Sequence, residues 1–257
     1  MNRVLQAELL DQLPETDPRA RRSRRDLRRV NALMGNAGIL ARELASFLST
    51  FDQSSPLRLL ELGAGDGSLL LHVARALKRL RLNSPPLNVR AQLLDQQNLL
   101  RPQMQQAFRD LGWHVQPLAT TLQSWLESDS GPPCDVILAN LFLHHFDHST
   151  LRAVFEVIPD HGDFLIATEP RRSCLALSAG SLLGLIGCND VTCHDARVSI
   201  RAGFTGTELT QLWPHSRPGW ILSEKRAGLF THLFCAQRAG RCPTLAPIKR
   251  AAPQTLS

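Results

Sequence analysis

The chain has 257 residues, of which 43% are hydrophobic and 20% charged, and this composition fits one α/β domain with a short accessory segment. The formal net charge is +6, but residues 1–30 carry +3 and residues 238–257 carry +4, which leaves −1 for residues 31–237. This distribution disfavours a nucleic-acid substrate, and the longest apolar stretch, 175–187, is too short for a bilayer span of about 20 residues.

The first fifty residues have helical patterns, and residues 52–56 form a linker. We expect an N-terminal helical cap over residues 1–56. Its charged start lacks the apolar core of a signal peptide. Met34 and neighbouring apolar side chains are candidates to enclose an apolar substrate, and packing of the same side chains onto a sheet is the alternative.

From residue 57 onward, apolar strands alternate with helices, which predicts βαβ units and a parallel sheet. Only Ala227 and Gly228 join the last two strands, so these form an antiparallel hairpin. The expected fold class is α/β: a Rossmann-like, seven-stranded sheet with five parallel strands, a C-terminal antiparallel hairpin and helices on both faces. Strands are predicted at 57–63, 88–95, 113–118, 134–140, 162–169, 220–226 and 229–238, and helices at 67–80, 99–112, 120–126, 149–158, 173–187 and 206–213.

Two further segments complete the predicted organisation. Residues 189–204 read as an irregular region. We assign residues 57–242 to the main domain and expect the Pro/Ala-rich tail, 243–257, to be disordered.

Three glycines, Gly63, Gly65 and Gly67, lie between the first strand and its helix. An open α/β sheet binds its ligand at this position, and glycine lets a ligand approach the backbone. The dinucleotide fingerprint is incomplete because Ser68 stands where the third glycine belongs, and no Walker lysine follows.

The stretch "LELGAGDGSLL" resembles motif I of the class I S-adenosylmethionine-dependent methyltransferases. The resemblance implies S-adenosylmethionine as cofactor, with the glycine loop against its methionyl part and an acidic residue after the second strand on the ribose hydroxyls. Asp95 occupies that acidic position, and a carboxylate accepts two hydrogen bonds from a cis-diol. The cofactor-binding candidates here are Glu61, Gly63, Ala64, Gly65, Gly67, Asp95 and Gln96.

The stretch "CDVILANLFLHHF" resembles the fourth-strand motif of the same family. The resemblance implies that Asn140 and Leu141 border the cofactor. Thr120, after the third strand, would contribute to the adenine wall, where the family often has an acidic residue that this chain lacks.

The "LHH" element is similar to that of methyltransferases of quinone, lipid and polyketide biosynthesis. His144 and His145 are therefore candidates for the catalytic base, since imidazole titrates near neutrality. The alternative is that one histidine caps the turn and the other faces solvent. The [ND]PP[YF] motif of amino-group methylation is absent from the sequence.

Further candidates lie after the fifth strand. Glu169, Arg171 and Arg172, in "EPRRS", and Arg201 are candidates to orient a polar substrate group. The His194–Asp195 pair is a candidate base. A surface ion pair and a solvated loop are the alternatives.

Six cysteines show no CxxC pair. Cys188, Cys193 and His194 offer three potential metal ligands without a second cluster to complete a tetrahedral site. We therefore expect no metal, and reduced thiols in a cytoplasmic protein.

The sequence thus predicts methyl transfer from S-adenosylmethionine to a small, apolar, aromatic or polyketide-like acceptor. Methylation of oxygen is favoured over carbon because a histidine base helps most there. An RNA or protein methyltransferase that uses the basic ends, and a non-catalytic cofactor-binding subunit, are the alternatives. The predicted partner is the small-molecule acceptor, with neither nucleic acid nor a transmembrane segment, and the oligomeric state stays open.

Overall fold

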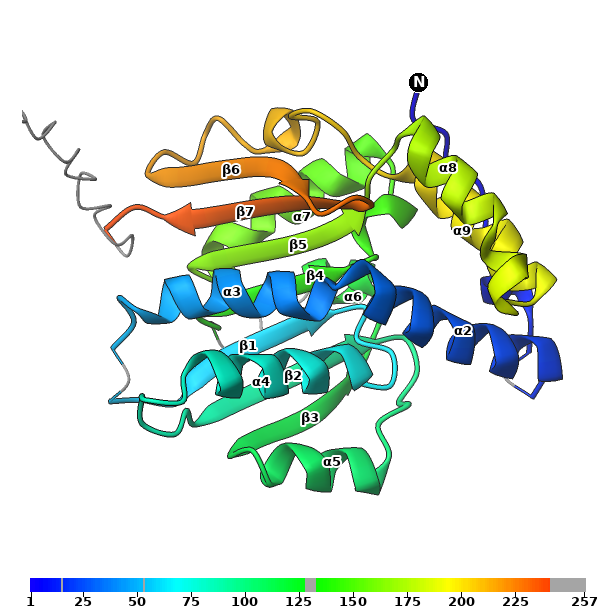
Figure 1. Ribbon diagram of the computed structural model, residues 1–257. Helices are drawn as coiled ribbons and strands as arrows, with labels where there is room; N and C mark the ends of the chain where they lie inside the picture. The colour runs from blue at the N-terminus through cyan, green and yellow to red at the C-terminus, as the bar shows by residue number, and fades with distance from the viewer. Residues whose placement is uncertain (15, 53, 128–132, 241–257) are drawn as a thin grey trace, which may run out of the picture.

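The structure is a computed structural model that describes residues 1–14, 16–52, 54–127 and 133–240. Its centre is a seven-stranded sheet of order β3-β2-β1-β4-β5-β7-β6 (Figure 1). Strands β1 to β5 are parallel, whereas β7 runs antiparallel to both β5 and β6, so the predicted fold class is confirmed. The strands are β1 (Leu57–Leu62), β2 (Val89–Asp95), β3 (Trp113–Ala119), β4 (Val136–Asn140), β5 (Phe164–Pro170), β6 (Trp220–Ala227) and β7 (Thr231–Arg238).

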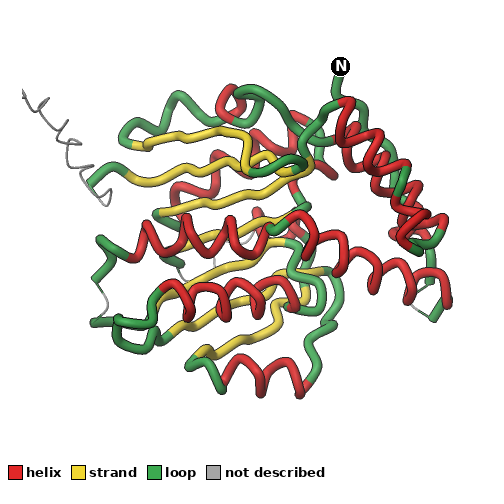
Figure 2. Tube along the Cα trace, viewed as in Figure 1, coloured by secondary structure: helices red, strands yellow, loops and turns green. Residues whose placement is uncertain are grey.

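Helices cover both faces of the sheet (Figures 1 and 2), which is why β5 is buried at every position while the edge strand β6 alternates. One face carries α3, α4 and α5, and the other carries α6 and α7. These helices are α3 (Asn36–Leu48), α4 (Ser68–Leu80), α5 (Pro102–Arg109), α6 (Leu122–Glu127) and α7 (His148–His161).

Helix α3 belongs to the main core rather than to a separate cap. Its Leu40, Leu44 and Phe47 are almost fully buried against the sheet. Gly35, at φ +70°, separates α3 from the preceding helix α2 (Pro18–Met34) by a left-handed turn that favours glycine. Within the predicted cap, 1–56, only α1 (Leu9–Gln12) and α2 therefore lie beyond the carboxyl edge of the sheet (Figure 1).

The prediction that residues 189–204 are irregular is wrong, because most of this segment forms helix α9 (Asp190–Ala202). The Asn189 side chain accepts a hydrogen bond from the Thr192 N–H and caps the helix. The buried positions 191, 195, 198 and 202 have helical spacing, but Asp195 interrupts the apolar pattern in the sequence. Asp195 is buried because its carboxylate accepts the N–H groups of Leu9 and Leu10 at the start of α1.

Three other predicted elements differ in extent. The helix at 173–187 divides into α8 (Cys174–Ser181) and the 3-10 turn η2 (Leu183–Ile186). The helix at 206–213 is only a turn and a short 3-10 element, η3 (Thr210–Leu212), because Leu209 and Thr210 donate their N–H groups to the Glu224 side chain. The hairpin connection is three residues, 228–230, and the predicted disordered tail lies outside the described residues.

The five cysteines of the described segments, Cys134, Cys174, Cys188, Cys193 and Cys235, are free thiols. Among the helices that the structure describes, none combines the length and apolarity needed to cross a membrane.

Candidate functional site

The glycine loop at the end of β1 is fixed to the end of β2. The Gly65 N–H donates a hydrogen bond of 3.0 Å to one carboxylate oxygen of Asp95, and the Gln97 N–H donates one of 3.0 Å to the other. Each oxygen keeps a second lone pair for another donor. The parallel register of β1 and β2 brings these two strand ends together, as the predicted cofactor site requires.

The three glycines of the loop all have φ between +56° and +76°, a range that side chains disfavour. A Cβ placed on Gly63 would lie 2.3 Å from Cδ2 of Phe142, so that ring packs directly on the loop. A Cβ on Gly65 would meet nothing within 4 Å. The loop therefore presents open space over Gly65, next to the Asp95 carboxylate.

Glu61 is a buried acid at the end of β1, with 1% of its surface exposed. Burial, and then the nearby carboxylates of Asp66 and Asp95, raise its pKa to about 8. Its Oε2 has no hydrogen-bond partner among the described residues. A buried carboxyl with an unused acceptor is what a donor group or a cation on a bound ligand would satisfy.

The end of β4 combines a buried network with a strained residue. The Asn140 side-chain oxygen accepts hydrogen bonds from Asn36 Nδ2 at 2.7 Å and from the Thr168 hydroxyl at 2.9 Å. Asn36 in turn accepts a hydrogen bond from the Thr231 hydroxyl at 2.7 Å. Leu141 follows with φ +48°, a conformation that costs a non-glycine residue on the order of 1–3 kcal/mol. The side-chain oxygen of Asn140 thus holds α3, β4 and β5 together.

We expect Asn36→Ala to lower the free energy of unfolding by about 2 kcal/mol, because it removes one partner of Asn140 and the buried acceptor of Thr231. Urea unfolding followed by circular dichroism measures this change. The control is Asn98→Ala, at an exposed position, which should change stability by less than about 0.5 kcal/mol. Equal stability of the two variants would show that the network contributes nothing.

His144, in the 3-10 turn η1 (Leu143–His145), is buried between two carboxylates. Its Nδ1 lies 2.7 Å from Glu169 Oε2, and its Nε2 lies 3.5 Å from Glu8 Oε1. The Glu169 carboxylate also accepts the N–H groups of Phe142 and Leu143, which fixes the whole turn. Burial alone would lower the pKa of His144, but the two carboxylates outweigh it and raise that pKa to about 9. His144 is therefore a cation at pH 7.

His145 differs from His144 although the two rings are 4.2 Å apart. Its side chain reaches solvent. Partial desolvation, and then the positive charge of His144, lower the pKa of His145, so its imidazole is neutral at pH 7 and free to accept a proton.

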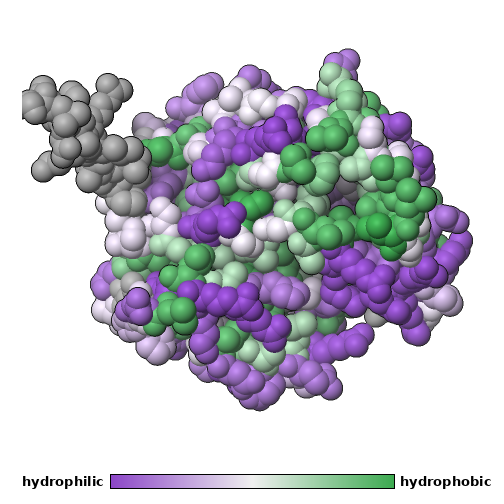
Figure 3. Space-filling model, in the orientation of Figure 1, coloured by the Kyte–Doolittle hydropathy of each residue, from purple (hydrophilic) through white to green (hydrophobic). Residues whose placement is uncertain are grey.

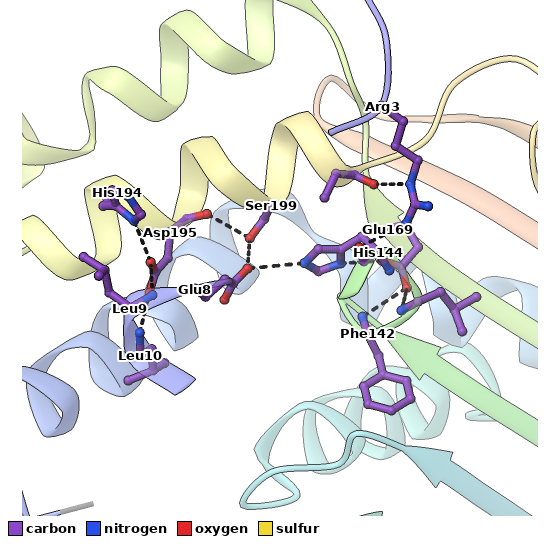
Figure 4. A network of polar contacts seen from close by, with 12 residues as sticks. Arg3, Glu8, Leu9, Leu10, Phe142, His144, Glu169, His194, Asp195 and Ser199 are labelled. Atoms are coloured by element: carbon purple, nitrogen blue, oxygen red, sulfur yellow. Dashed lines mark hydrogen bonds and ion pairs between the residues drawn. The ribbon is translucent and has the colours of Figure 1, made fainter. Parts of the chain in front are cut away.

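The N-terminal segment connects His144 to α9 through Glu8 (Figure 4). Glu8 accepts a hydrogen bond from the Ser199 hydroxyl, which lies within 2.9 Å of the Asp195 carbonyl oxygen. His194 is at the far end of this chain of contacts, with Nδ1 3.0 Å from Asp195 Oδ1. The structure thus separates His194 from the histidine pair by Asp195, Ser199 and Glu8.

Two arginines hold the N-terminal segment and the region after β5 in place. Arg3 donates to the carbonyl oxygens of His144 and Phe146, and its guanidinium lies 4.5 Å from the Phe204 ring centroid. Arg172, in "EPRRS", is buried and donates to the Met1 and Gly203 carbonyl oxygens and to Glu208. Arg172 therefore has a structural role.

The remaining predicted site residues occupy the same edge of the sheet or its surroundings. Thr120 follows β3 and donates its N–H to the Asp95 carbonyl oxygen at 3.0 Å. Arg171 follows β5 and is half-buried, whereas Arg201, on α9, is exposed. Ala64 and Gly67 are buried in the glycine loop, Gln96 is exposed after β2, and Met34 is half-buried at the end of α2.

Within the described residues, one group of side chains could supply three metal ligands, and it is not the Cys188, Cys193 and His194 set considered from the sequence. Potential ligand atoms of Glu8, His144 and His145 lie within 4.8 Å of one another. The Glu8 carboxylate already has the Ser199 hydroxyl and the His144 cation as partners, so the charges of this group are balanced by ion pairing. The absence of a metal stays a prediction.

A surface groove of about 590 Å³ lies beside the loop, lined by Asp66 and Ser68 from the loop side and by basic residues of α2, α4 and the segment before α5. Arg28, Arg75 and Arg101 belong to this lining. Neither Gly65 nor Asp95 is among the residues that line it.

Sequence reasoning missed Glu8 and Ser199 as parts of the site, and it placed Glu169 as a substrate-orienting candidate rather than as the partner of His144. Glu169 carried a signal, since it lies one residue before the end of β5, at the carboxyl edge, within the motif "EPRRS". Glu8 and Ser199 carried no signal. Glu8 lies 136 residues from His144 in the sequence and Ser199 lies 191 residues from Glu8, so only the tertiary fold brings them together.

Comparison by sequence finds no matching family model and no matching curated protein. Solved structures do match in fold. The plantazolicin methyltransferase BpumL in complex with SAH is 12% identical over 87% of this chain and 91% of its own, with a TM-score of 0.60. BamL, in complex with a triazolic desmethylPZN analog and SAH, is 14% identical over 89% and 92%, with a TM-score of 0.59.

A third structure, an O-methyltransferase family protein from Burkholderia thailandensis, is 21% identical over 87% of this chain and 61% of its own, with a TM-score of 0.53. At these identities the likeness concerns the fold. The chain has the Rossmann-like methyltransferase fold, as the resemblance of its glycine loop implied.

Proposed function

We propose that this chain, whose fold is that of methyltransferases, transfers a methyl group from S-adenosylmethionine to a small apolar acceptor. The observation that carries the proposal is the hydrogen bond between Gly65, in the loop after β1, and Asp95, at the end of β2. It joins a loop that is open to a ligand and a carboxylate that has lone pairs left for a diol.

The residues present fit the cofactor in three respects. Asp95 would accept the two ribose hydroxyls, and the space over Gly65 would admit the adjoining part of the molecule. Glu61, buried and with an unused oxygen, would receive positive charge from the methionyl end. Leu141 and Phe142, after β4, would border the same space, since the Phe142 ring lies on Gly63.

The bound cofactor supplies a methyl group on a sulfonium, which already activates it for transfer. The chain then has to orient the acceptor, exclude water and receive a proton. His145 is the proposed proton acceptor: its neutral imidazole would take the proton of the acceptor hydroxyl as the oxygen attacks. His144, as a cation held by Glu8 and Glu169, would fix the turn that carries His145.

The acceptor is proposed as small and apolar, aromatic or polyketide-like, with oxygen favoured over carbon. The B. thailandensis structure is an O-methyltransferase family protein, which agrees with oxygen as the target. Met34, Arg171, Arg201 and His194 stay candidates for acceptor contacts, and a cytoplasmic location is part of the same proposal.

An RNA or protein acceptor is the second candidate, because α2 exposes several arginines beyond the carboxyl edge of the sheet. It predicts RNA binding that falls steeply with salt and is lost on charge reversal in α2. A non-catalytic cofactor-binding subunit would bind the cofactor and transfer no methyl group.

The first experiment is calorimetric titration of the full chain with S-adenosylmethionine and S-adenosylhomocysteine, followed by a screen of phenolic acceptors for methyl transfer. We expect micromolar binding of both ligands, and methylated product from an apolar phenol. Folded protein that binds neither ligand would refute the proposal, and binding without transfer to any acceptor class would favour the non-catalytic subunit.

A separate prediction concerns the release of a proton from Glu61 when the cofactor binds. Its pKa of about 8 keeps the carboxyl mostly protonated at pH 7, and nearby positive charge on the cofactor would lower that pKa. Binding should therefore release close to one proton at pH 7, and affinity should rise as pH increases toward 8. Titrations in two buffers with different ionisation enthalpies measure the release. Glu61→Gln should abolish it, and identical enthalpies for the unmodified chain in both buffers would contradict this role.

A further inference from the structure

An apolar surface projects from the helices at the carboxyl edge. It is formed by Leu175 of α8, Leu182 between α8 and η2, and Leu185 and Ile186 of η2. Their exposed fractions are 55%, 57%, 83% and 56%. Figure 3 shows this surface as a continuous hydrophobic patch. Soluble proteins seldom expose adjacent large apolar side chains without a partner.

The packing of α8 explains why these side chains point outward. The inner side of α8 lies against α9 through small residues, since a Cβ on Gly180 would be 3.0 Å from Ile200 Cδ1, and Ala176 is buried. The larger leucines occupy the opposite side. Helix α8 therefore packs its small residues against α9 and exposes its larger apolar side chains, which have no packing partner in the described structure.

A basic surface adjoins the apolar one. Arg22 of α2 donates a 3.0 Å hydrogen bond to the Gly187 carbonyl oxygen at the end of η2, and Asn189 donates to the Arg19 carbonyl oxygen at 2.9 Å. These bonds fix α2 beside η2, and Figure 3 shows the hydrophilic surface of α2 directly adjacent to the patch. The exposed arginines of α2 are Arg19, Arg21, Arg22, Arg25, Arg28 and Arg29.

The charged side chains of α2 beside the patch are mostly positive, although Asp190, at the start of α9, is an exposed acid. Residues 173–189, which contain α8 and η2, include no charged side chain. No ion pair within the described segments involves Arg21, Arg22 or Arg25, whereas Asp26 of the same helix is buried and bonded to the Asn189 N–H. The surface thus combines projecting leucines with uncompensated positive charge.

We propose that this surface docks the protein on an anionic lipid bilayer, with the leucines of η2 inserted at the headgroup level and the arginines of α2 on lipid phosphates. Leucine insertion accounts for the apolar side chains, and anionic headgroups account for the arginines beside them. Nucleic acid would match only the arginines, and a second copy of this chain would bring like charges together. Docking of this kind is independent of methyl transfer.

The test is co-sedimentation of the full chain with vesicles of phosphatidylcholine alone or of phosphatidylcholine with phosphatidylglycerol. We expect binding to the anionic vesicles only, weakened strongly by about 0.5 M salt. Leu185→Asp should reduce the vesicle partition coefficient about tenfold or more, because it places a charge where an apolar side chain inserts. The control Leu82→Asp, at a 78% exposed leucine after α4, should leave it unchanged.

A charge-matched pair tests the arginines. Arg21→Glu/Arg25→Glu should reduce binding to anionic vesicles about tenfold, whereas Lys78→Glu/Arg79→Glu, the same charge change on exposed positions of α4, should not. All variants alter exposed side chains, and circular dichroism verifies that they fold.

Three results would overturn the proposal: no binding to anionic vesicles, equal loss in each variant and its control, or a dimer by light scattering that Leu185→Asp converts to monomer. Cofactor titration of the same preparations separates this outcome from the proposed function, since docking can fail while cofactor binding persists.

Discussion

Replacing Asp95 with alanine should weaken binding of S-adenosylmethionine by about a hundredfold or more. A carboxylate that accepts two hydrogen bonds from a diol contributes about 1.5–3 kcal/mol for each, and alanine removes both. The variant also deprives the Gly65 and Gln97 N–H groups of their acceptor, which loosens the loop. Calorimetric titration measures the affinity, and methyl transfer should fall in parallel at subsaturating cofactor.

The control for this variant is Asp110→Ala. Asp110 is an exposed carboxylate at the end of α5 that accepts a hydrogen bond from Gln106, so its loss matches Asp95→Ala in charge and size. We expect its cofactor affinity to be unchanged. If Asp95→Ala bound the cofactor as tightly as Asp110→Ala, the ribose diol would have another partner. The assignment of Asp95 as the diol-binding residue would then be wrong.

Gly65→Ala should weaken cofactor binding about a hundredfold while the protein stays folded. The added methyl group would meet nothing within 4 Å in the protein, so it occupies the space that the ligand would use. The backbone at φ +56° costs an alanine about 1 kcal/mol, which the domain tolerates. We expect about a hundredfold loss of affinity, measured by titration, with a thermal midpoint within a few degrees of the unmodified chain.

Gly206→Ala provides the matched control, because Gly206 has φ +61° and a Cβ there would also meet nothing within 4 Å. It adds the same backbone strain away from the loop, so it should reproduce the small loss of stability and leave affinity intact. Gly63→Ala is the contrasting case, since its Cβ would lie 2.3 Å from Phe142. It should lower stability as well as affinity. Normal affinity in Gly65→Ala would mean that the open space holds no ligand.

The sequence by itself determined the sheet and the meeting of the glycine loop with Asp95 at its carboxyl edge. Apolar runs such as "VILAN" and the alternation with helices predicted a parallel sheet, and one short connection predicted the hairpin. These features depend on local pattern and chain connectivity, which a single sequence contains. The glycine loop and Asp95 follow from the same logic, because the ends of adjacent parallel strands must meet.

The sequence was less informative about the helices beyond the carboxyl edge. Asp195 interrupted the apolar pattern of α9 and suggested an irregular segment, although its carboxylate is buried as the cap of α1. The helix expected at 206–213 does not form for a related reason, since the Glu224 side chain on β6 accepts hydrogen bonds from the N–H groups of Leu209 and Thr210. In both cases a long-range hydrogen bond outweighed the local propensity.

Only the tertiary structure decided which histidine is charged. His144 and His145 are adjacent in the sequence and chemically alike, yet Glu8 and Glu169 surround one of them and solvent meets the other. The pKa of His144 rises to about 9 while that of His145 falls. A pKa depends on burial and on charges within a few ångströms, and those neighbours come from the N-terminal segment and from β5. No local pattern specifies them, because they approach the pair only after the chain has folded.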